Sequence, residues 1–350
     1  MADSPSASDP RPRRDLGSRV GLVVAALLLV AYPWAAPNSY LRYAGVLVVM
    51  YAALSTAWNL VGGFTGYISL GHAAFFGLGA YATGIGVLNL GLPHWLALIL
   101  GVVLVVLFAA GVGVAAVRVR GSSFVIVSIA LVSMTNLVAQ NARALTGGSS
   151  GLRIPALVEG LDRTTNHVVF FYLFLALLAL VLVTWWFVDR SRFGAGLKAI
   201  REDEDKAEAL GVPTNAYKVT VYAASAGFVA AAGGLYGVWF GSLDPIFVFS
   251  IVIGANMVLM ALLGGMRFLL GPVLGAFIVA PTSEYFLLAY GESQLHIVLS
   301  GALLAIVVLF MPDGIIPAVR SLWRRRGPRA ASISEQSAAE LRAAREEVTA

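Results

Sequence analysis

Apolar runs of about 20 residues recur along most of this chain, and they constrain its fold more than any other feature. A helical run of that length matches the roughly 30 Å hydrocarbon core of a bilayer. Within that core every backbone N–H and C=O group needs a partner in the protein, so only helices and closed β-barrels can cross it. The runs are continuous rather than alternating, which excludes a barrel. We therefore expect an all-α polytopic membrane protein.

Composition excludes several other classes. Of the 350 residues, 59% are hydrophobic and 12% are charged, whereas soluble domains have about 25% charged residues. The chain has no cysteine, and its four histidines form no ligand-spaced pair, so we expect no disulfide and no metal site. The motif GxxxxGK followed by Ser or Thr is absent, so the sequence has no ATP-binding P-loop. We attribute the net charge of +5 to orientation in a membrane, not to a nucleic-acid partner.

The pattern predicts about ten membrane spans. The run 20–36 also has the form of a cleavable signal peptide, but the next apolar run begins near Leu41, which favours a first span. The N-terminal segment 1–17 is a polar tail that we expect to be disordered. The ten candidate spans are 18–37, 41–62, 66–90, 93–117, 123–145, 167–188, 216–240, 246–265, 268–290 and 295–311.

Positive charges predict the orientation of these spans. With the N-terminus in the cytoplasm, all but four of the 24 Lys and Arg residues fall in cytoplasmic segments; the exceptions are Arg42, Arg143, Arg153 and Arg163. Such a bias is the usual one in membrane proteins. We therefore expect both termini in the cytoplasm, a permease domain over 18–320 and a charged tail over 321–350.

The cytoplasmic segment 189–215 differs from the other loops in being long and rich in charge. From Ala195 to Leu210 its acidic and basic residues alternate at spacings that allow pairs four residues apart on a helix. Gly211 and Pro213 supply a stop signal. The pattern predicts one short helix on the cytoplasmic surface.

Polar side chains within the spans are few, and such residues usually face a cavity or another helix. For Asn136, Gln140 and Asn256 we favour a hydrogen bond to a neighbouring helix. Glu284 is the acid placed well inside a span, and a secondary transporter would depend on it. The full set is Asn59, His72, Asn136, Gln140, Asn256, Glu284 and His296.

Glycine crowds the segment 62–86, with Gly62, Gly63, Gly66, Gly71, Gly77, Gly79, Gly84 and Gly86. Glycine permits unwound backbone at mid-membrane, as in many transporters, but also close helix packing alone. We expect 66–90 to be a broken or partly re-entrant helix. The candidate substrate pathway consists of polar residues in or beside this segment, with two more at the outer mouth: Asn59, Tyr67, Ser69 and His72, then Thr146 and Gly147.

The run WNLVGGFTGYISLGHAAFFG at 58–77 resembles the N-terminal signature of branched-chain amino acid ABC permeases. Within that family, LTGG at 145–148 with GL at 151–152 is similar to the LivM branch rather than the LivH branch. Further matches follow in the family's order and cover about 41–320. They are SRFG at 191–194, AIRE at 199–202, AEALG at 207–211, Lys218, LGG at 263–265, GPVLGA at 271–276 and FMPDGI at 310–315.

This resemblance implies a permease subunit with the fold of type II ABC importers, which translocates branched-chain amino acids across the bacterial cytoplasmic membrane. It also implies a second, LivH-like permease, two ATPase subunits that bind the ATP, and an extracytoplasmic substrate-binding protein. The chain itself would have no catalytic residue and no cofactor. The family's ATPase-coupling role falls on Ala199, Ile200, Arg201, Glu202, Ala207, Glu208, Ala209, Leu210 and Gly211.

The sequence departs from the family's pattern at two places, and three alternative functions remain. Arg267 stands in a glycine-rich stretch where relatives often have Gly-Gly-x-Gly-Ser/Thr, and the run 202–205 is unusually acidic. Urea and short-chain amide permeases look similar, so the substrate could belong to those classes. A secondary transporter and an intramembrane enzyme are the other functional classes. An enzyme would need a Ser/His, paired-Asp or metal-ligand set within the bilayer, and the sequence shows none.

Overall fold

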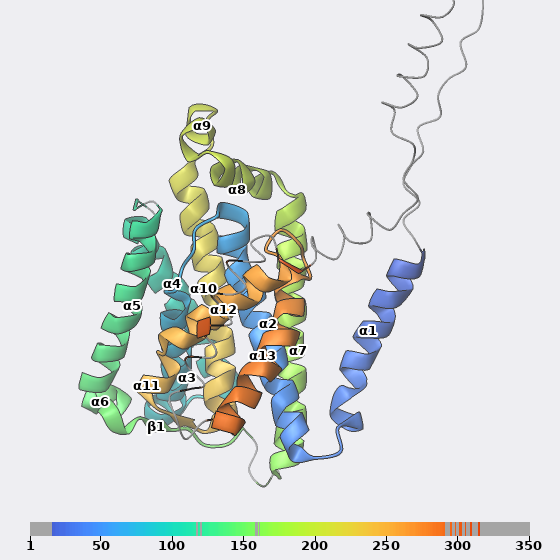
Figure 1. Ribbon diagram of the computed structural model, residues 1–350. Coiled ribbons are helices and arrows are strands. Elements are labelled where there is room, and N and C mark those ends of the chain that lie inside the picture. Colours follow the sequence, from blue (N-terminus) through green and yellow to red (C-terminus); the bar gives the residue numbers. More distant parts are fainter. Residues whose placement is uncertain are drawn as a thin grey trace, which may run out of the picture.

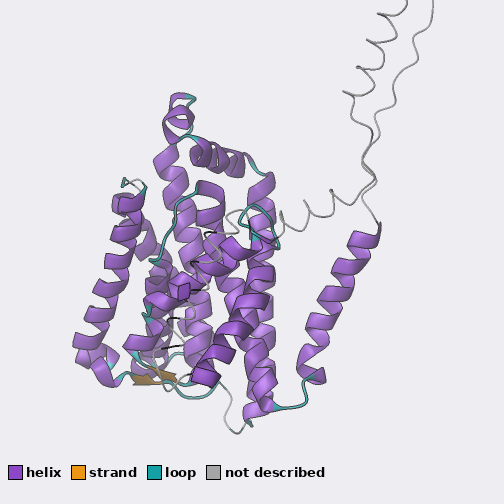
Figure 2. Ribbon diagram, viewed as in Figure 1, coloured by secondary structure: helices purple, strands orange, loops and turns teal. Residues whose placement is uncertain are grey.

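The computed structural model describes residues 16–290 except 117, 120, 158, 159 and 161, together with isolated positions between 295 and 315. Nearly all of the described elements are helices, most of them roughly parallel or antiparallel in one bundle (Figures 1 and 2). The long helices are α1 (Leu16–Ala35), α2 (Ser39–Thr65), α3 (His72–Leu90), α4 (His94–Ala116), α5 (Ser122–Asn141), α7 (Arg163–Arg190), α10 (Thr214–Phe240), α12 (Ile251–Gly264) and α13 (Gly271–Tyr290). The short helices are α6 (Arg143–Thr146), α8 (Arg192–Glu202), α9 (Glu204–Ala209), α11 (Pro245–Val248) and the 3₁₀ turn η1 (Gly148–Ser150).

Eight helical segments of the described chain are long and apolar enough to cross a membrane. They are α2, α3, α4, α5, α7, α10, the pair α11–α12 and α13, so the prediction of a polytopic helical membrane protein is confirmed. Helix α1 coincides with the expected span 18–37. Nearly all of the expected tenth span, 295–311, and all of the tail 321–350 lie outside the described residues. The number ten and the side of the termini stay predictions.

Local side-chain chemistry sets the helix ends. The Asn38 side chain accepts a hydrogen bond from the Leu41 amide and begins α2, and Asp162 does the same for Thr165 at the start of α7. Gly66 ends α2 in the left-handed conformation with φ of 76°, which a residue with a Cβ rarely adopts.

The interior of the bundle is formed by α2, α3 and α10, whose side chains are mostly buried. Helices α4, α5 and α13 leave most of their side chains exposed or only partly buried, as expected of surfaces that face lipid. Helix α1 stands apart from the other helices in Figure 1. Near its C-terminal end the Trp34 indole N–H donates to the Tyr172 hydroxyl of α7 at 2.9 Å.

One small departure from an all-helical fold lies among the described residues. Strands β1 (Leu152–Arg153) and β2 (Ser242–Leu243) form a two-stranded antiparallel ribbon in which Leu152 pairs with Leu243. The ribbon lies at the end of the bundle opposite α8 and α9 (Figure 1). We call these two ends the ribbon end and the α8 end.

Two local expectations need correction. The expected single helix over 195–210 is two helices, because Asp203 is extended (φ −163°, ψ 108°) and its side chain accepts from the Lys206 amide, starting α9. The break expected within 66–90 lies at its beginning: residues 66–71 are non-helical, and α3 is then continuous through its glycines. Those glycines therefore allow close helix packing, not an unwound backbone.

Candidate functional site

Helix α8 lies across one end of the bundle, between the ends of α7 and α10 (Figure 1). Ser191 ends α7 and also caps α8, because its hydroxyl accepts from the Gly194 amide at 3.0 Å. The buried face of α8 consists of Gly194, Gly196, Leu197 and Ile200. The turn at Ser191 therefore fixes the direction of α8, and burial of this face holds it on the spans.

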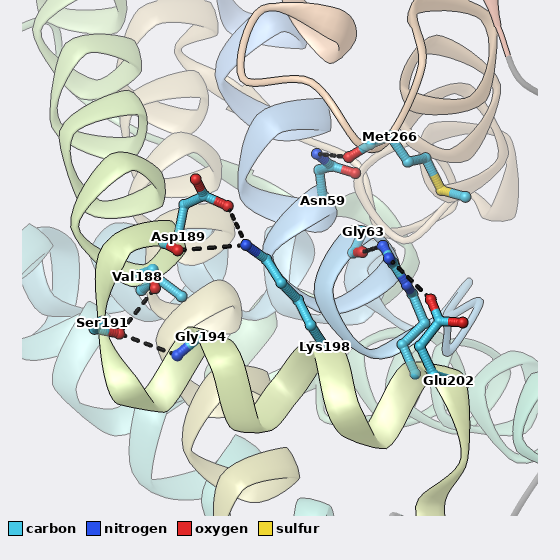
Figure 3. Close-up of polar contacts among 10 residues, drawn as sticks. Asn59, Gly63, Val188, Asp189, Ser191, Gly194, Lys198, Glu202 and Met266 are labelled. Carbon is cyan, nitrogen blue, oxygen red and sulfur yellow. Dashed lines mark hydrogen bonds and ion pairs between the residues drawn. The ribbon is translucent and has the colours of Figure 1, made fainter. Parts of the chain in front are cut away.

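Arg201 joins α8 to the end of α2. Its Nη1 donates to the Gly63 carbonyl oxygen at 2.7 Å, one of the carbonyls that a helix C-terminus leaves available (Figure 3). One turn earlier, the Asn59 Nδ2 donates to the Met266 carbonyl oxygen at 3.0 Å, which joins α2 to the segment after α12. A Cβ on Gly63 would meet this Met266 oxygen at 2.9 Å. Close backbone approach at Gly63 thus brings three segments together.

Lys198 joins α8 to the last turn of α7. Its Nζ lies 2.6 Å from the Asp189 Oδ1 and 3.3 Å from the Asp189 carbonyl oxygen (Figure 3). Both side chains are partly exposed, at 42% and 35%. Water therefore screens this pair, and its contribution to stability is small.

A buried ion pair joins α9 to α10. The Lys218 Nζ lies 2.6 Å from the Glu204 Oε1, and the two side chains are 3% and 11% exposed. The Tyr67 hydroxyl donates to the other Glu204 oxygen at 2.6 Å, and the Lys218 ammonium lies over the Tyr67 ring at 5.2 Å. The Glu204 carboxylate of α9 therefore binds both α10 and the segment between α2 and α3.

The surface of α9 carries a second, exposed pair. The Lys206 Nζ lies 2.9 Å from the Asp203 Oδ2. Hydrogen bonds from the Lys206 side chain and amide hold the pKa of the Asp203 carboxyl below its usual range. The same side-chain hydrogen bond raises the pKa of Lys206. Both groups therefore stay charged across the neutral range.

Four of the six candidate pathway residues lie in the half of the bundle nearer the α8 end. The His72 Nε2 is 2.9 Å from the Ser225 Oγ, which donates to the Ala57 carbonyl oxygen at 2.6 Å. The Ser69 carbonyl oxygen accepts from the Trp58 indole N–H at 2.6 Å. Asn59, Ser69 and His72 are fully buried, and Tyr67 contacts Glu204 as described above.

The other two candidate pathway residues lie at the ribbon end. The Thr146 hydroxyl is 2.6 Å from the Ala139 carbonyl oxygen and accepts from the Gly148 amide. The Gly147 amide donates to the Arg143 carbonyl oxygen. These groups hold the turn after α5 together, and the structure does not bring them near Asn59 or His72.

A large cavity lies between α3, α4 and α5 and has a volume of about 630 Å³. Leucine, isoleucine, valine, alanine and phenylalanine side chains form most of its wall, with Thr135 and Thr146 among the few polar residues. Of the six candidate pathway residues, only Thr146 lines it.

One expectation for the polar residues within spans is wrong. We expected Asn136 and Gln140 to bond a neighbouring helix, but the Gln140 Nε2 donates to the Asn136 Oδ1 of the same helix, α5, at 2.8 Å.

The nine candidate coupling residues differ in exposure: some are buried, some are partly buried and some are exposed. Ile200 and Ala207 are buried. Leu210 is 84% exposed at the outer end of the segment, an unusual position for a large apolar side chain. Ala199 and Arg201 are partly buried, and the residues exposed with Leu210 are Glu202, Glu208, Ala209 and Gly211.

The spans and their capped connections define a polytopic α-helical membrane protein with a rigid helix pair at one end. Residues 40–308 match the family described as "Branched-chain amino acid transport system / permease component". The chain belongs to this family, as the resemblance over 58–77 predicted, and it is a LivM-type ABC transporter permease.

Three individual proteins show what the chain is similar to. The high-affinity branched-chain amino acid permease protein LivM of Escherichia coli is 26% identical over 325 residues, covering 85% of this chain and 75% of that protein. LivH of Salmonella typhimurium is 29% identical over 287 residues, covering 76% of this chain and 91% of that protein. A solved structure of PsaBC from Streptococcus pneumoniae with a Fab matches 84% of this chain and 97% of its own, with 15% identity and a TM-score of 0.42.

Sequence reasoning missed five members of this site as functional candidates: Asp189, Lys198, Glu204, Lys218 and Met266. Lys218 stood at the edge of an apolar run, a placement typical of a cation near a membrane boundary. The separation of 14 residues between Glu204 and Lys218 gives no helical signal for a pair. Met266 takes part through its backbone, which no side-chain pattern reveals.

Proposed function

We propose that this chain is the membrane-spanning subunit of an ABC importer for leucine, isoleucine and valine in the bacterial cytoplasmic membrane. The α8 end would face the cytoplasm, and the ribbon end would face the substrate-binding protein. The observation that carries the proposal is the docking of α8 and α9 on three spans through Arg201, Lys198 and Glu204. A force applied to this helix pair would reach α2, α7 and α10 directly.

The energy source would lie in other subunits. The sequence has no P-loop, and the exposed side of the helix pair around Glu208 and Leu210 is free to bind a partner. Two ATPase subunits would bind at the α8 end, one on this chain and one on a LivH-like permease. Because packed interfaces change between discrete arrangements, closure of the ATPases would move the attached spans as rigid units.

Uptake by the assembled transporter tests this proposal. Membranes with this chain, its second permease, both ATPases and the binding protein should take up radiolabelled leucine only when ATP is present. Omission of any one component should abolish uptake. Uptake of urea or a short-chain amide in place of leucine would contradict the substrate class, and uptake by this chain alone would contradict the ABC mechanism.

Replacement of Glu208 by alanine and Leu210 by serine should uncouple ATP hydrolysis from uptake. Loss of an apolar side chain that anchors an interface raises the Kd of the complex about tenfold. We expect the ATPase to dock on this surface more weakly by that factor. Uptake driven by the ATPases should fall by about the same factor, while membrane insertion of the chain is unchanged. Leu210→Met keeps an apolar anchor and should transport normally. Normal coupled uptake in the double variant would contradict the coupling role of this surface.

Alanine at Asn59 and at His72 tests the candidate pathway. Each change removes a buried hydrogen bond, to the Met266 carbonyl or to the Ser225 hydroxyl. We expect a lower uptake rate and a changed ratio of leucine to valine uptake. Gln140→Ala is the matched control, because its amide bonds only Asn136 among the described residues. Unchanged rate and selectivity in both alanine variants would remove these two residues from the pathway.

A further inference from the structure

A basic cavity lies between α8, the ends of α2 and α7, and the segment that joins α12 to α13. Its volume is about 250 Å³, whereas one water needs only about 10–15 Å³. Figure 3 shows Lys198 and Asp189 on one side of this region, with Gly63 and Met266 on the other. The lining residues are Gly63, Phe64, Trp185, Asp189, Lys198, Arg201, Met266 and Arg267.

The charges that line this cavity do not balance. Three of the lining residues are cations, namely Lys198, Arg201 and Arg267, and one is an anion, Asp189. Asp189 pairs with Lys198 at 2.6 Å. The pairs formed among the described residues include none for Arg267, which is exposed on the segment after α12. Arg201 pairs with the exposed Glu202 at 3.4 Å. Within the described chain, Arg267 therefore supplies the positive charge of the cavity that no carboxylate compensates.

Two buried hydrogen-bond donors of the cavity have no acceptor among the described residues. One is the indole N–H of Trp185, whose side chain is only 7% exposed. The other is the Nε of Arg201, whose Nη1 and Nη2 are used by Gly63 and Glu202. Buried donors are nearly always satisfied, so an unsatisfied pair that lines one cavity points to an external acceptor. Cations and N–H donors together suit an oxyanion with several acceptor atoms.

The residues beside the cavity have the character of a membrane boundary. In the last turns of α7, Trp186 and Phe187 are exposed, and the Arg190 guanidinium lies 4.2 Å from the centre of the Trp186 ring. Aromatic side chains with nearby cations are typical of the level of lipid headgroups. Basic pockets between spans at this level bind the headgroups of anionic lipids.

We propose that this cavity binds a phosphate group, and that its source is the headgroup of an anionic phospholipid. The phosphate oxygens would accept from Trp185 Nε1 and Arg201 Nε and would neutralise Arg267. The bound group would connect α8 to the segment between α12 and α13, which share no polar contact of their own within the described chain. Anionic lipid would thereby stabilise the docked position of α8.

Lipid retention by the purified full chain tests this site. The protein in detergent is titrated with dioleoyl phosphatidylglycerol or dioleoyl phosphatidylcholine, and bound lipids are counted by native mass spectrometry. We expect preferential retention of phosphatidylglycerol. Arg267→Gln should weaken that retention about fivefold, as expected for one cation near an anionic headgroup. Trp185→Phe should also weaken it while keeping the ring contact with Phe64.

A matched control and a third ligand distinguish the outcomes. Arg118→Gln removes an exposed arginine beyond the end of α4, outside the cavity, and should leave retention unchanged. Inorganic phosphate is the third ligand, with the melting temperature as readout. If phosphate stabilises the chain through Arg267 without any preference for phosphatidylglycerol, the site binds phosphate from solution and the lipid source is wrong. If neither ligand depends on Arg267, the proposal is overturned. None of these readouts requires uptake, so they are independent of the proposed transport function.

Discussion

Lys218→Met is expected to destabilise the chain more than any other charge removal among the residues described. It leaves the Glu204 carboxylate, 11% exposed, without the ammonium that lies 2.6 Å away. Breaking a buried ion pair from one side costs about 3–5 kcal/mol, because the remaining charge stays in a medium that solvates it poorly. The melting temperature of the purified chain in detergent measures this loss. In the assembled transporter, a loosened α9 should also lower the uptake obtained per ATP hydrolysed.

Two further variants test whether burial of the Lys218–Glu204 pair causes this loss of stability. Lys206→Met removes a pair of similar length on the same segment, but the Lys206 side chain is 82% exposed, so the melting temperature should hardly change. Lys218→Met combined with Glu204→Gln removes both charges and should recover much of the lost stability. Equal melting temperatures for the Lys218 and Lys206 variants would show that burial of the first pair has no energetic consequence.

The features predicted correctly from sequence are those that local chemistry determines. Length and apolarity alone place a helix over each of the expected spans from 41 to 290, because the bilayer imposes both. Helix starts are also determined locally, although the expected spans 41–62 and 167–188 did not place them. The side chains of Asn38 and Asp162 each accept a hydrogen bond from the amide three residues later. The charge pattern of 195–210 indicated helix correctly but not its interruption. A single side chain, Asp203, competes with the backbone there.

The candidate site was harder to predict because tertiary contacts create it. Asn59 meets Met266 across 207 residues, and Tyr67 meets Glu204 across 137. Neither contact has a periodic signal, and both depend on how α2 packs against later segments. The sequence indicated that Asn59, Tyr67 and His72 were unusual, since polar groups in spans are costly. Their partners became visible only in the folded chain.

Gly79→Ala and Gly233→Ala are expected to push apart the two helices at the centre of the bundle. A Cβ on Gly79 of α3 would meet the carbonyl oxygen of Ala230, and a Cβ on Gly233 of α10 would meet that of Phe76. These obstacles are backbone atoms, so no side-chain rotation relieves them. Overpacking of a core costs about 1–3 kcal/mol, which here opposes a gain of about 1 kcal/mol from the higher helix propensity of alanine. We expect a lower melting temperature for both variants.

Gly111→Ala on α4 is the matched control, because no atom lies within 4 Å of the Cβ it would introduce. Helix propensity alone then acts, and the melting temperature should stay constant or rise slightly. The comparison also separates the two roles that glycine can have in a transporter span. Close packing predicts that Gly79→Ala lowers stability and uptake together. A role in unwound backbone predicts lost uptake at unchanged stability, and that outcome would contradict the continuous helix from His72 to Leu90.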